Sequence, residues 1–223
     1  MDAKVVCAME RTQRRFSMTT IVFPPGRFIC YLRQPKAATL SMTHWLVDLA
    51  KQNNKPYLTS LPYQQKNYNV DVEQDTIITH HMTAARVKEV FPQWWNKMEK
   101  MVTVRNPWNL LASKYYHMRK LGVTQARTDT FENFCLGLID LRGTLNPGKE
   151  YYSINNEIIA EHIIPIEDLE THLTRIFKGY TLPPIPFVNV GSNGNYKKLF
   201  NSDINKLIHR DFAWEIETFN YKF

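Results

Sequence analysis

The chain has 223 residues, of which 43% are hydrophobic and 22% are charged. These values predict one folded domain with a substantial core over residues 1–223, and the 13% of aromatic residues argues against disorder over most of the length. The excess of 28 Lys and Arg over 21 Asp and Glu favours anionic partners, such as a nucleotide, a sulfated or phosphorylated substrate, or nucleic acid.

The cysteines and the N-terminal residues bear on the compartment. Cys7, Cys30 and Cys135 are widely spaced and form no CxxC pair, which argues against a disulfide framework or a zinc site and favours a reducing compartment. No run reaches the ~20 apolar residues that span a bilayer, and the N-terminal residues lack the apolar segment of a secretory signal. We expect an irregular basic extension over residues 1–20 and a soluble, cytoplasmic chain.

Short runs rich in β-branched and aromatic residues predict the strands. The candidates are Phe28–Leu32, Thr76–Thr79, Lys100–Asn106 and the start of EHIIPIEDLETHL, with TTIVFPPGRF as a further short extended piece broken by Pro24, Pro25 and Gly26.

Helical patterns follow most of these strands. The first expected helix begins at Thr39, the second covers TAARVKEVF, and the third is PWNLLASKYYHMRKLG with Pro107 as its first residue. The fourth lies in TFENFCLGLIDLRG with Thr130 as N-cap, and the fifth continues EHIIPIEDLETHL towards Gly179. The last closes the chain in SDINKLIHRDFAWEIETF with Ser202 as the cap. LPPIPF forbids regular structure, and GSNGNYKKLF is typical of a polar loop. The alternation predicts βαβ units and an α/β fold around a mostly parallel sheet.

Basic residues come directly after three of the candidate strands. Lys36, His80, His81 and Arg105 all occupy such positions. Since ligands of parallel sheets bind at the carboxyl ends of the strands, these four residues are the first candidates for a functional site.

The segment PKAATLS lies where a strand gives way to a helix. Free backbone N–H groups and the helix dipole favour an anion there, with Lys36 adding a charge and Thr39 and Ser41 adding hydroxyl groups. The segment is not a Walker A motif, and its alanines can replace glycines only if the loop needs no residue at positive φ. Taken alone, this pattern is more typical of a solvated lysine at a helix start.

The segment VRNPWNLLASKYY places Arg105 after a strand and Ser113 eight residues later on the following helix. The planar guanidinium fork suits a phosphate, and a serine hydroxyl can complete the site. A helix-capping arginine and a small serine at a packing face explain the same residues. Both interpretations stay open from the residues alone.

Taken together, PKAATLS, RNPWNLLASKYY and the terminal DFAWEIETFNYKF resemble the sulfotransferase superfamily, in its carbohydrate-type (sulfotransferase family 2-like) branch. HMTAARVKEVF and IIPIEDLETHL also resemble segments of these enzymes, and the resemblance runs from about Phe28 to the C-terminus. It implies a three-layer P-loop-like fold with a central mostly parallel sheet flanked by helices, and 3′-phosphoadenosine 5′-phosphosulfate (PAPS) as the sulfuryl donor.

The resemblance also implies roles for individual residues. Lys36 would contact the oxygen that bridges to the leaving sulfuryl group, and Arg105 and Ser113 would hold the 3′-phosphate. His81 is the expected general base, with His80 as the alternative. The residues expected to surround the 5′-phosphosulfate are Ala37, Ala38, Thr39, Leu40 and Ser41, and Tyr196 and Lys198 are expected phosphate or adenine contacts. Leu40 stands where a small or hydroxyl residue is common, so either Thr39 or Ser41 can be the main hydroxyl donor.

The expected function is therefore transfer of a sulfuryl group from PAPS to a hydroxyl acceptor, a carbohydrate by this resemblance, leaving adenosine 3′,5′-bisphosphate (PAP). Transfer of this kind passes through a loose, in-line transition state and needs positioning and charge stabilisation, with no metal expected. One alternative is a non-catalytic protein of the same fold that binds PAP. A basic nucleic-acid-binding protein is another, although the chain carries no nucleic-acid motif and we expect no such partner.

Overall fold

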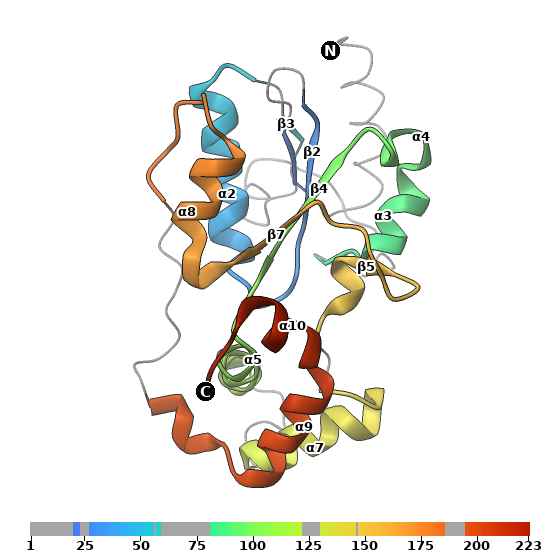
Figure 1. Cartoon of the computed structure of the whole chain (residues 1–223), viewed down its shortest axis with the longest axis vertical. Helices are drawn as coiled ribbons and strands as arrows, with labels where there is room; N and C mark the ends of the chain where they lie inside the picture. Colours follow the sequence, from blue (N-terminus) through green and yellow to red (C-terminus); the bar gives the residue numbers. More distant parts are fainter. Residues whose placement is uncertain are drawn as a thin grey trace.

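The computed structural model describes residues 20–22, 27–55, 57–58, 81–121, 130–145, 147–185 and 195–223. A five-stranded sheet in the order β3-β1-β2-β4-β7 runs through the described part of the chain (Figure 1). Its strands are β1 (Thr20–Val22), β2 (Ile29–Leu32), β3 (Tyr57–Leu58), β4 (Glu99–Val104) and β7 (His162–Pro165). Strands β2, β4 and β7 are parallel, and helices flank them on both sides.

The expectation of a mostly parallel sheet is only partly correct. Strand β1 pairs antiparallel with both β2 and β3, so two of the four strand pairings are antiparallel. For β1 and β2 the physical reason is the short connection between Val22 and Ile29, because a parallel crossover needs a dozen or more residues whereas an antiparallel return does not. The fold is thus a mixed α/β arrangement with a parallel centre of three strands.

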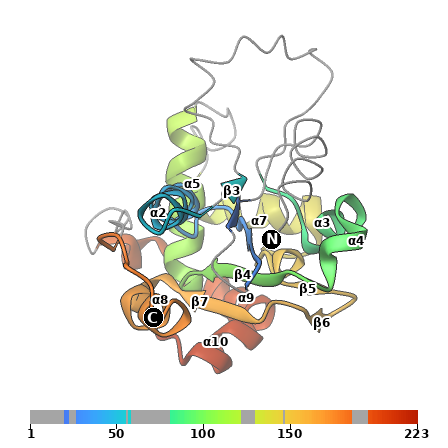
Figure 2. The ribbon, with the colours of Figure 1, turned by 90° about the horizontal axis from the view of Figure 1, so that it is seen from above.

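Eight α-helices lie among the described residues. They are α2 (Thr39–Gln52), α3 (Ala84–Val90), α4 (Pro92–Trp95), α5 (Pro107–Leu121), α7 (Phe131–Arg142), α8 (Leu169–Ile176), α9 (Ser202–Asp211) and α10 (Ala213–Phe219). Figures 1 and 2 show α2 and α8 on one side of the sheet and α3 and α4 on the other. A small hairpin of β5 (Ser153–Ile154) and β6 (Glu157–Ile158) lies near α3.

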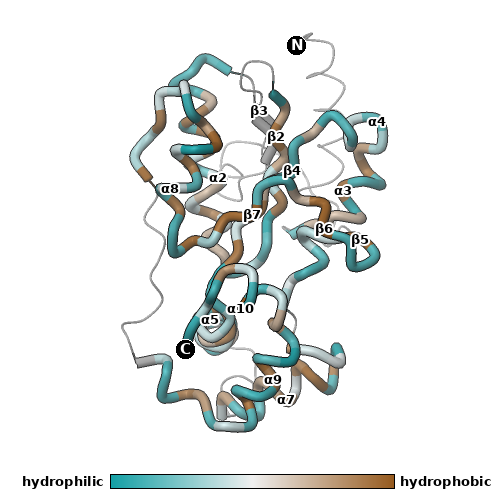
Figure 3. Tube along the Cα trace, in the orientation of Figure 1, coloured by the Kyte–Doolittle hydropathy of each residue, from teal (hydrophilic) through white to brown (hydrophobic). Residues whose placement is uncertain are grey.

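Strand β2 shows how the sequence builds these layers. All four of its residues are buried, as expected for a parallel strand covered on both faces. Ile29 and Tyr31 pack with α2 and α8, whereas Cys30 and Leu32 point to the opposite face and pack with α3 and Trp95. This alternation follows from the two-residue period of a strand. Strand β7, brown along much of its length in Figure 3, supplies apolar residues to the same two layers.

A third apolar cluster lies beyond the carboxyl ends of the parallel strands. Most of its buried members come from α5, α7 and α9, and they include Trp108, Leu111, Phe131 and Ile208. Figure 1 shows β4 running into α5, which crosses below the sheet with α7 and α9 on its far side. The edge of the sheet where ligands are expected therefore faces α5.

Most predicted elements are confirmed. The strands expected at Phe28–Leu32 and Lys100–Asn106 are β2 and β4, and Thr130 caps α7 by accepting a hydrogen bond from the Asn133 N–H. The strand expected at Thr76–Thr79 lies outside the described residues. Within GSNGNYKKLF, residues Asn195–Leu199 form a 3-10 helix, η4, where a loop was expected.

The expected single closing helix is wrong in two respects. It is two helices, α9 and α10, because the backbone at the buried Phe212 leaves the helical region. Its cap is Asn201, whose Oδ1 accepts from the Ile204 N–H at 2.9 Å, and Ser202 is the first residue inside the helix. Among the helices described, none combines the length and apolarity needed to cross a membrane.

Candidate functional site

The connection between β2 and α2, residues 33–38, is called the Lys36 turn here. Lys36 has φ 65° and Ala38 has φ 57°, both in the left-handed region. The expectation that alanines can replace glycines here, because the loop needs no residue at positive φ, is therefore wrong. A left-handed residue other than glycine costs roughly 1–2 kcal/mol, so the surrounding contacts must hold this backbone in place.

Hydroxyl groups supply those contacts. The Thr39 hydroxyl donates to the Gln34 carbonyl oxygen at 2.6 Å, and the Thr103 hydroxyl on β4 donates to the Ala37 carbonyl oxygen. Thr39 is buried and uses its proton within the turn, whereas Ser41 is half-buried and Leu40 is 53% exposed. Of the two predicted hydroxyl donors, Ser41 is thus the one nearer the surface.

The half-buried Lys36 side chain lies among other cations. Burial lowers the pKa of its ammonium group, and the nearby charges of Arg105 and Lys120 lower that pKa further. Within the described part of the chain, no carboxylate forms an ion pair with Lys36. An anion bound beside it would relieve this repulsion.

Arg105, immediately after β4, is a buried cation at 5% exposure, and Arg33 of the Lys36 turn is buried too, at 2%. Nη1 of Arg105 donates to the Lys36 carbonyl oxygen at 3.2 Å, and its Nη2 donates to Asn109 Oδ1 at 2.7 Å. Its Nε is buried and has no hydrogen-bond partner among the described residues. Burial lowers the pKa of the guanidinium, while the nearby Glu167 and Tyr196 oppose that shift.

These contacts test whether the site fits a phosphate. A buried cation is costly unless a charge or hydrogen bonds compensate it, and Arg105 forms no ion pair with any carboxylate in the described residues. Its fork is only partly used, because two N–H groups hold neutral oxygens and Nε is unsatisfied. The donor set therefore fits a phosphate or sulfate group.

Helix α5 extends this cationic region away from the sheet. Asn109, the half-buried Ser113 and His117 follow one another at intervals of four residues, which places them on one face of the helix. Burial lowers the pKa of His117, and the charges of Lys36 and Lys120 lower it further, so Lys36 lies near this face. Ser113 thus sits on the face that begins beside Arg105. Asn109 and His117 were missed from the sequence, although the four-residue spacing was visible there.

His81 reaches the same edge of the sheet from the start of α3. Its Nδ1 lies 2.6 Å from the Arg33 carbonyl oxygen, and its ring packs edge-on with the Tyr151 ring, with the ring centroids 6.4 Å apart. Since a carbonyl oxygen only accepts, Nδ1 carries the proton, and a neutral ring then has its lone pair on Nε2. Thr83 caps α3 by accepting from the Arg86 N–H, so helix capping is not the role of His81. His80 lies outside the described residues.

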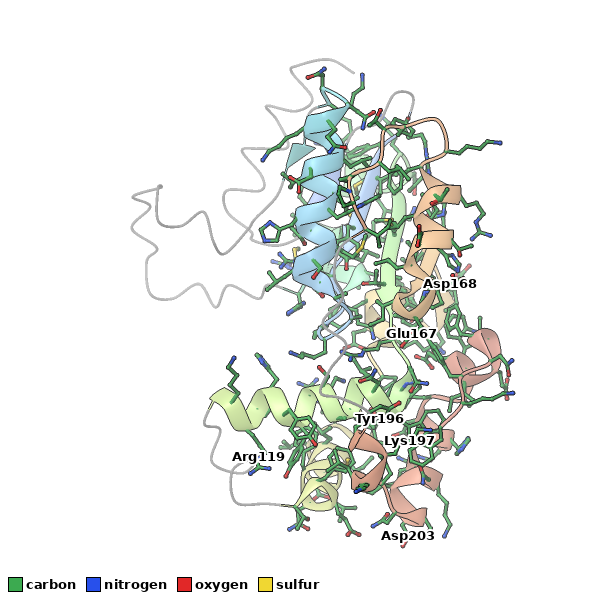
Figure 4. The ribbon with its side chains drawn as sticks, turned by 90° about the vertical axis from the view of Figure 1, so that its left-hand side faces the viewer. Arg119, Glu167, Asp168, Tyr196, Lys197 and Asp203 are labelled. Atoms are coloured by element: carbon green, nitrogen blue, oxygen red, sulfur yellow. The ribbon has the colours of Figure 1, made fainter. Side chains whose placement is uncertain are left out.

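The two predicted nucleotide contacts of the segment GSNGNYKKLF, Tyr196 and Lys198, are placed differently from one another. The helix η4 packs against α5, and Tyr196 within it lies close enough to Arg105 to act on the guanidinium pKa. Lys198 is exposed. Figure 4 shows Tyr196 and Glu167 flanking the start of α5.

Comparisons with protein-family models, with curated proteins and with solved structures find no match to this chain. The sulfotransferase resemblance therefore stays a prediction from the sequence. The described residues hold no group of three or more His, Cys, Asp or Glu side chains placed to bind a metal ion.

Proposed function

We propose that this protein binds PAPS at the carboxyl ends of β2 and β4 and transfers its sulfuryl group to a hydroxyl acceptor. The observation that carries the proposal is the buried Arg105, which lacks a carboxylate ion pair among the described residues and donates to the backbone of the Lys36 turn. Two cationic turns at neighbouring strand ends suit a ligand with two separated anionic groups. A three-layer P-loop-like architecture is part of the same proposal.

The proposed roles follow from burial and position. Arg105 and Ser113 hold the 3′-phosphate, which is the group that distinguishes PAPS from ATP. Lys36 faces the 5′-phosphosulfate together with the backbone of residues 37–41. Because Arg105 donates to the Lys36 carbonyl oxygen, occupation of the 3′-phosphate position also fixes the turn that meets the phosphosulfate.

The chemistry requires the protein to stabilise a developing charge and to accept a proton. The acceptor oxygen forms a bond to sulfur while the bond from sulfur to the bridging oxygen breaks, and charge develops on that bridging oxygen. The Lys36 ammonium stabilises this charge. The acceptor proton passes to Nε2 of His81, and the hydrogen bond from Nδ1 to the Arg33 carbonyl oxygen stabilises the resulting imidazolium. The acceptor is proposed to be a carbohydrate hydroxyl.

The test is a thermal shift series with PAP, ATP and AMP on the wild type, Arg105→Gln and Arg119→Gln. Arg119 is an exposed arginine of α5 that rests over the Tyr115 ring, which makes it a matched control. PAP should raise Tm more than ATP or AMP in the wild type and in Arg119→Gln, and Arg105→Gln should lose this preference. Equal shifts for all three nucleotides would overturn the proposal.

Transfer is tested separately with labelled PAPS and a panel of hydroxyl acceptors. A PAP preference that depends on Arg105, without transfer to any acceptor, would indicate the non-catalytic PAP-binding alternative. A Tm increase with oligonucleotides that exceeds the increase with PAP would indicate the nucleic-acid-binding alternative.

A further inference from the structure

Glu167 stands beside Arg105 without pairing with it. It belongs to the short helix η3 (Ile166–Asp168), which follows β7, the strand next to β4. Its charge acts on the Arg105 guanidinium, yet no ion pair joins the two residues. A carboxylate near a buried cation can compensate its charge by forming an ion pair with it.

Both carboxylate oxygens of Glu167 are held by other donors. Oε1 accepts from the Asn106 N–H at 2.8 Å, and Oε2 accepts from the Tyr221 hydroxyl at 3.2 Å. Burial raises the pKa of Tyr221, and the neighbouring Glu167 raises it further, so the phenol keeps its proton and remains a donor. These two hydrogen bonds hold the carboxylate in a position where it forms no ion pair with the guanidinium.

The position of Tyr221 is itself fixed by the residues around it. Its N–H donates to the Ile216 carbonyl oxygen at 3.1 Å, and the Lys222 carbonyl oxygen accepts from Asn106 Nδ2 at 3.0 Å. The Phe223 ring packs against Trp108 on α5, with ring centroids 5.6 Å apart. The contacts of the Tyr221 backbone and of the two residues that follow it thus hold the Tyr221 phenol in place.

We infer that Tyr221 is a positioning residue, which keeps Glu167 from forming an ion pair with Arg105 and so preserves the positive charge of Arg105 for an anionic ligand. The inference rests on the proposed function for the identity of that ligand. Removal of the Tyr221 hydroxyl frees Oε2 to turn towards Arg105 and compete with the ligand phosphate. Glu167→Gln removes the competing charge and keeps an oxygen that accepts from Asn106.

The first experiment measures the Kd of PAP by calorimetry for the full chain and its variants Tyr221→Phe, Glu167→Gln and the double variant. Tyr221→Phe should weaken binding about three- to tenfold, and the double variant should bind as Glu167→Gln does. Tyr180→Phe, which removes a half-buried phenol hydroxyl beyond α8, is the matched control and should bind as the wild type does. Unchanged affinity in Tyr221→Phe would overturn the inference, and so would a double variant as weak as Tyr221→Phe alone.

A second experiment needs no ligand and separates this inference from the proposed function. The coupling between Arg105→Gln and Glu167→Gln is measured as a Tm difference in a double-mutant cycle, once in the wild-type background and once in Tyr221→Phe. We expect a larger coupling in the Tyr221→Phe background, because only there do the two charges meet. Equal coupling in both backgrounds would overturn the inference about Tyr221, even if PAP binds. If PAP does not bind but the coupling is larger in Tyr221→Phe, the inference about Tyr221 stands and only PAP as the ligand is refuted.

Discussion

The guanidinium of Arg105 donates to the carbonyl oxygen of Lys36 across 3.2 Å, so the cation after one strand holds the backbone after its neighbour. The two residues are 69 positions apart in the chain. Their contact makes the proposed 3′-phosphate and phosphosulfate positions parts of one structure. Substitutions at Arg105 should therefore change both the local positive charge and the position of the Lys36 backbone.

Arg105→Lys keeps the charge but loses the fork that donates to Lys36 and Asn109. Loss of these two hydrogen bonds should destabilise the protein by about 1–3 kcal/mol and weaken PAP binding even though the cation remains. Chemical denaturation and calorimetry measure the two effects. Arg119→Lys is the control and should change neither quantity, and an Arg105→Lys variant with wild-type stability and affinity would contradict the role given to the fork.

Lys36→Met removes the ammonium group and retains an unbranched side chain of similar length. Because burial and the charges of Arg105 and Lys120 already disfavour the charged form, this change should leave the stability close to that of the wild type. PAP affinity should fall only modestly, whereas transfer from PAPS should drop by about 100-fold or more, since the charge matters most on the leaving oxygen. Single-turnover transfer measures this, with Lys178→Met as an exposed-lysine comparison.

The variants His81→Asn and His81→Ala separate the structural role of Nδ1 from the proposed role of Nε2 as the base. Asparagine can still donate to the Arg33 carbonyl oxygen, so it should preserve the stability that alanine loses, about 1 kcal/mol for that hydrogen bond. Both variants should bind PAP and lose transfer, because neither supplies a base. Full activity in His81→Ala would place the base elsewhere, and His80 would be the next residue to replace.

Ala38→Gly should stabilise the protein, although it introduces glycine beside a helix. The residue is the N-cap of α2 with φ 57° and makes no side-chain capping hydrogen bond. Relief of the roughly 1–2 kcal/mol for a left-handed alanine outweighs the roughly 0.5–1 kcal/mol entropy cost of glycine. Tm should rise, whereas Ala112→Gly, inside α5 and buried, should lower it. A lower Tm in Ala38→Gly would contradict the left-handed conformation.

Acid stability should depend on Glu99 at the amino end of β4. A hydrogen bond from Arg27 lowers the pKa of Glu99 to about 2 against burial, and a hydrogen bond from His162 contributes in the same direction. Because the folded pKa lies below the ordinary value of 4.5, the carboxylate stabilises the fold above pH 4.5 and loses this effect as the pH falls towards 2. Glu99→Gln should lower Tm clearly at pH 6 and much less at pH 2, whereas Glu217→Gln should change Tm at neither pH.

The elements with strong periodicity were predictable from the sequence. The apolar run of β2, the spacing that begins α2 at Thr39 and the Thr130 cap are all local patterns, and local patterns carry their own structure. The proximity of Lys36 and Arg105 also follows from adjacent parallel strands, since carboxyl ends meet at one edge.

What could not be predicted depends on contacts between distant residues. Neither lysine nor alanine signals a left-handed conformation, and the Lys36 turn keeps it because the Thr103 hydroxyl on β4 reaches the Ala37 carbonyl oxygen. The break between α9 and α10 occurs at Phe212, where the backbone leaves the helical region within an otherwise continuous helical pattern. The contacts of Glu167 could not be predicted either, because its two donors, Asn106 and Tyr221, are 61 and 54 residues away.

The parallel strand pairings also determine at which stage of folding the anion site can form. Arg105 meets Lys36 only after β4 has paired with β2, and Asn106 meets Glu167 only after β7 has paired with β4. Contacts this distant in sequence close large loops, which makes such pairings slow steps of folding. A chain in which either pairing is missing lacks the anion site. Recovery of PAP binding during refolding should therefore trail the recovery of helical signal, so that ligand affinity marks the last stage of folding.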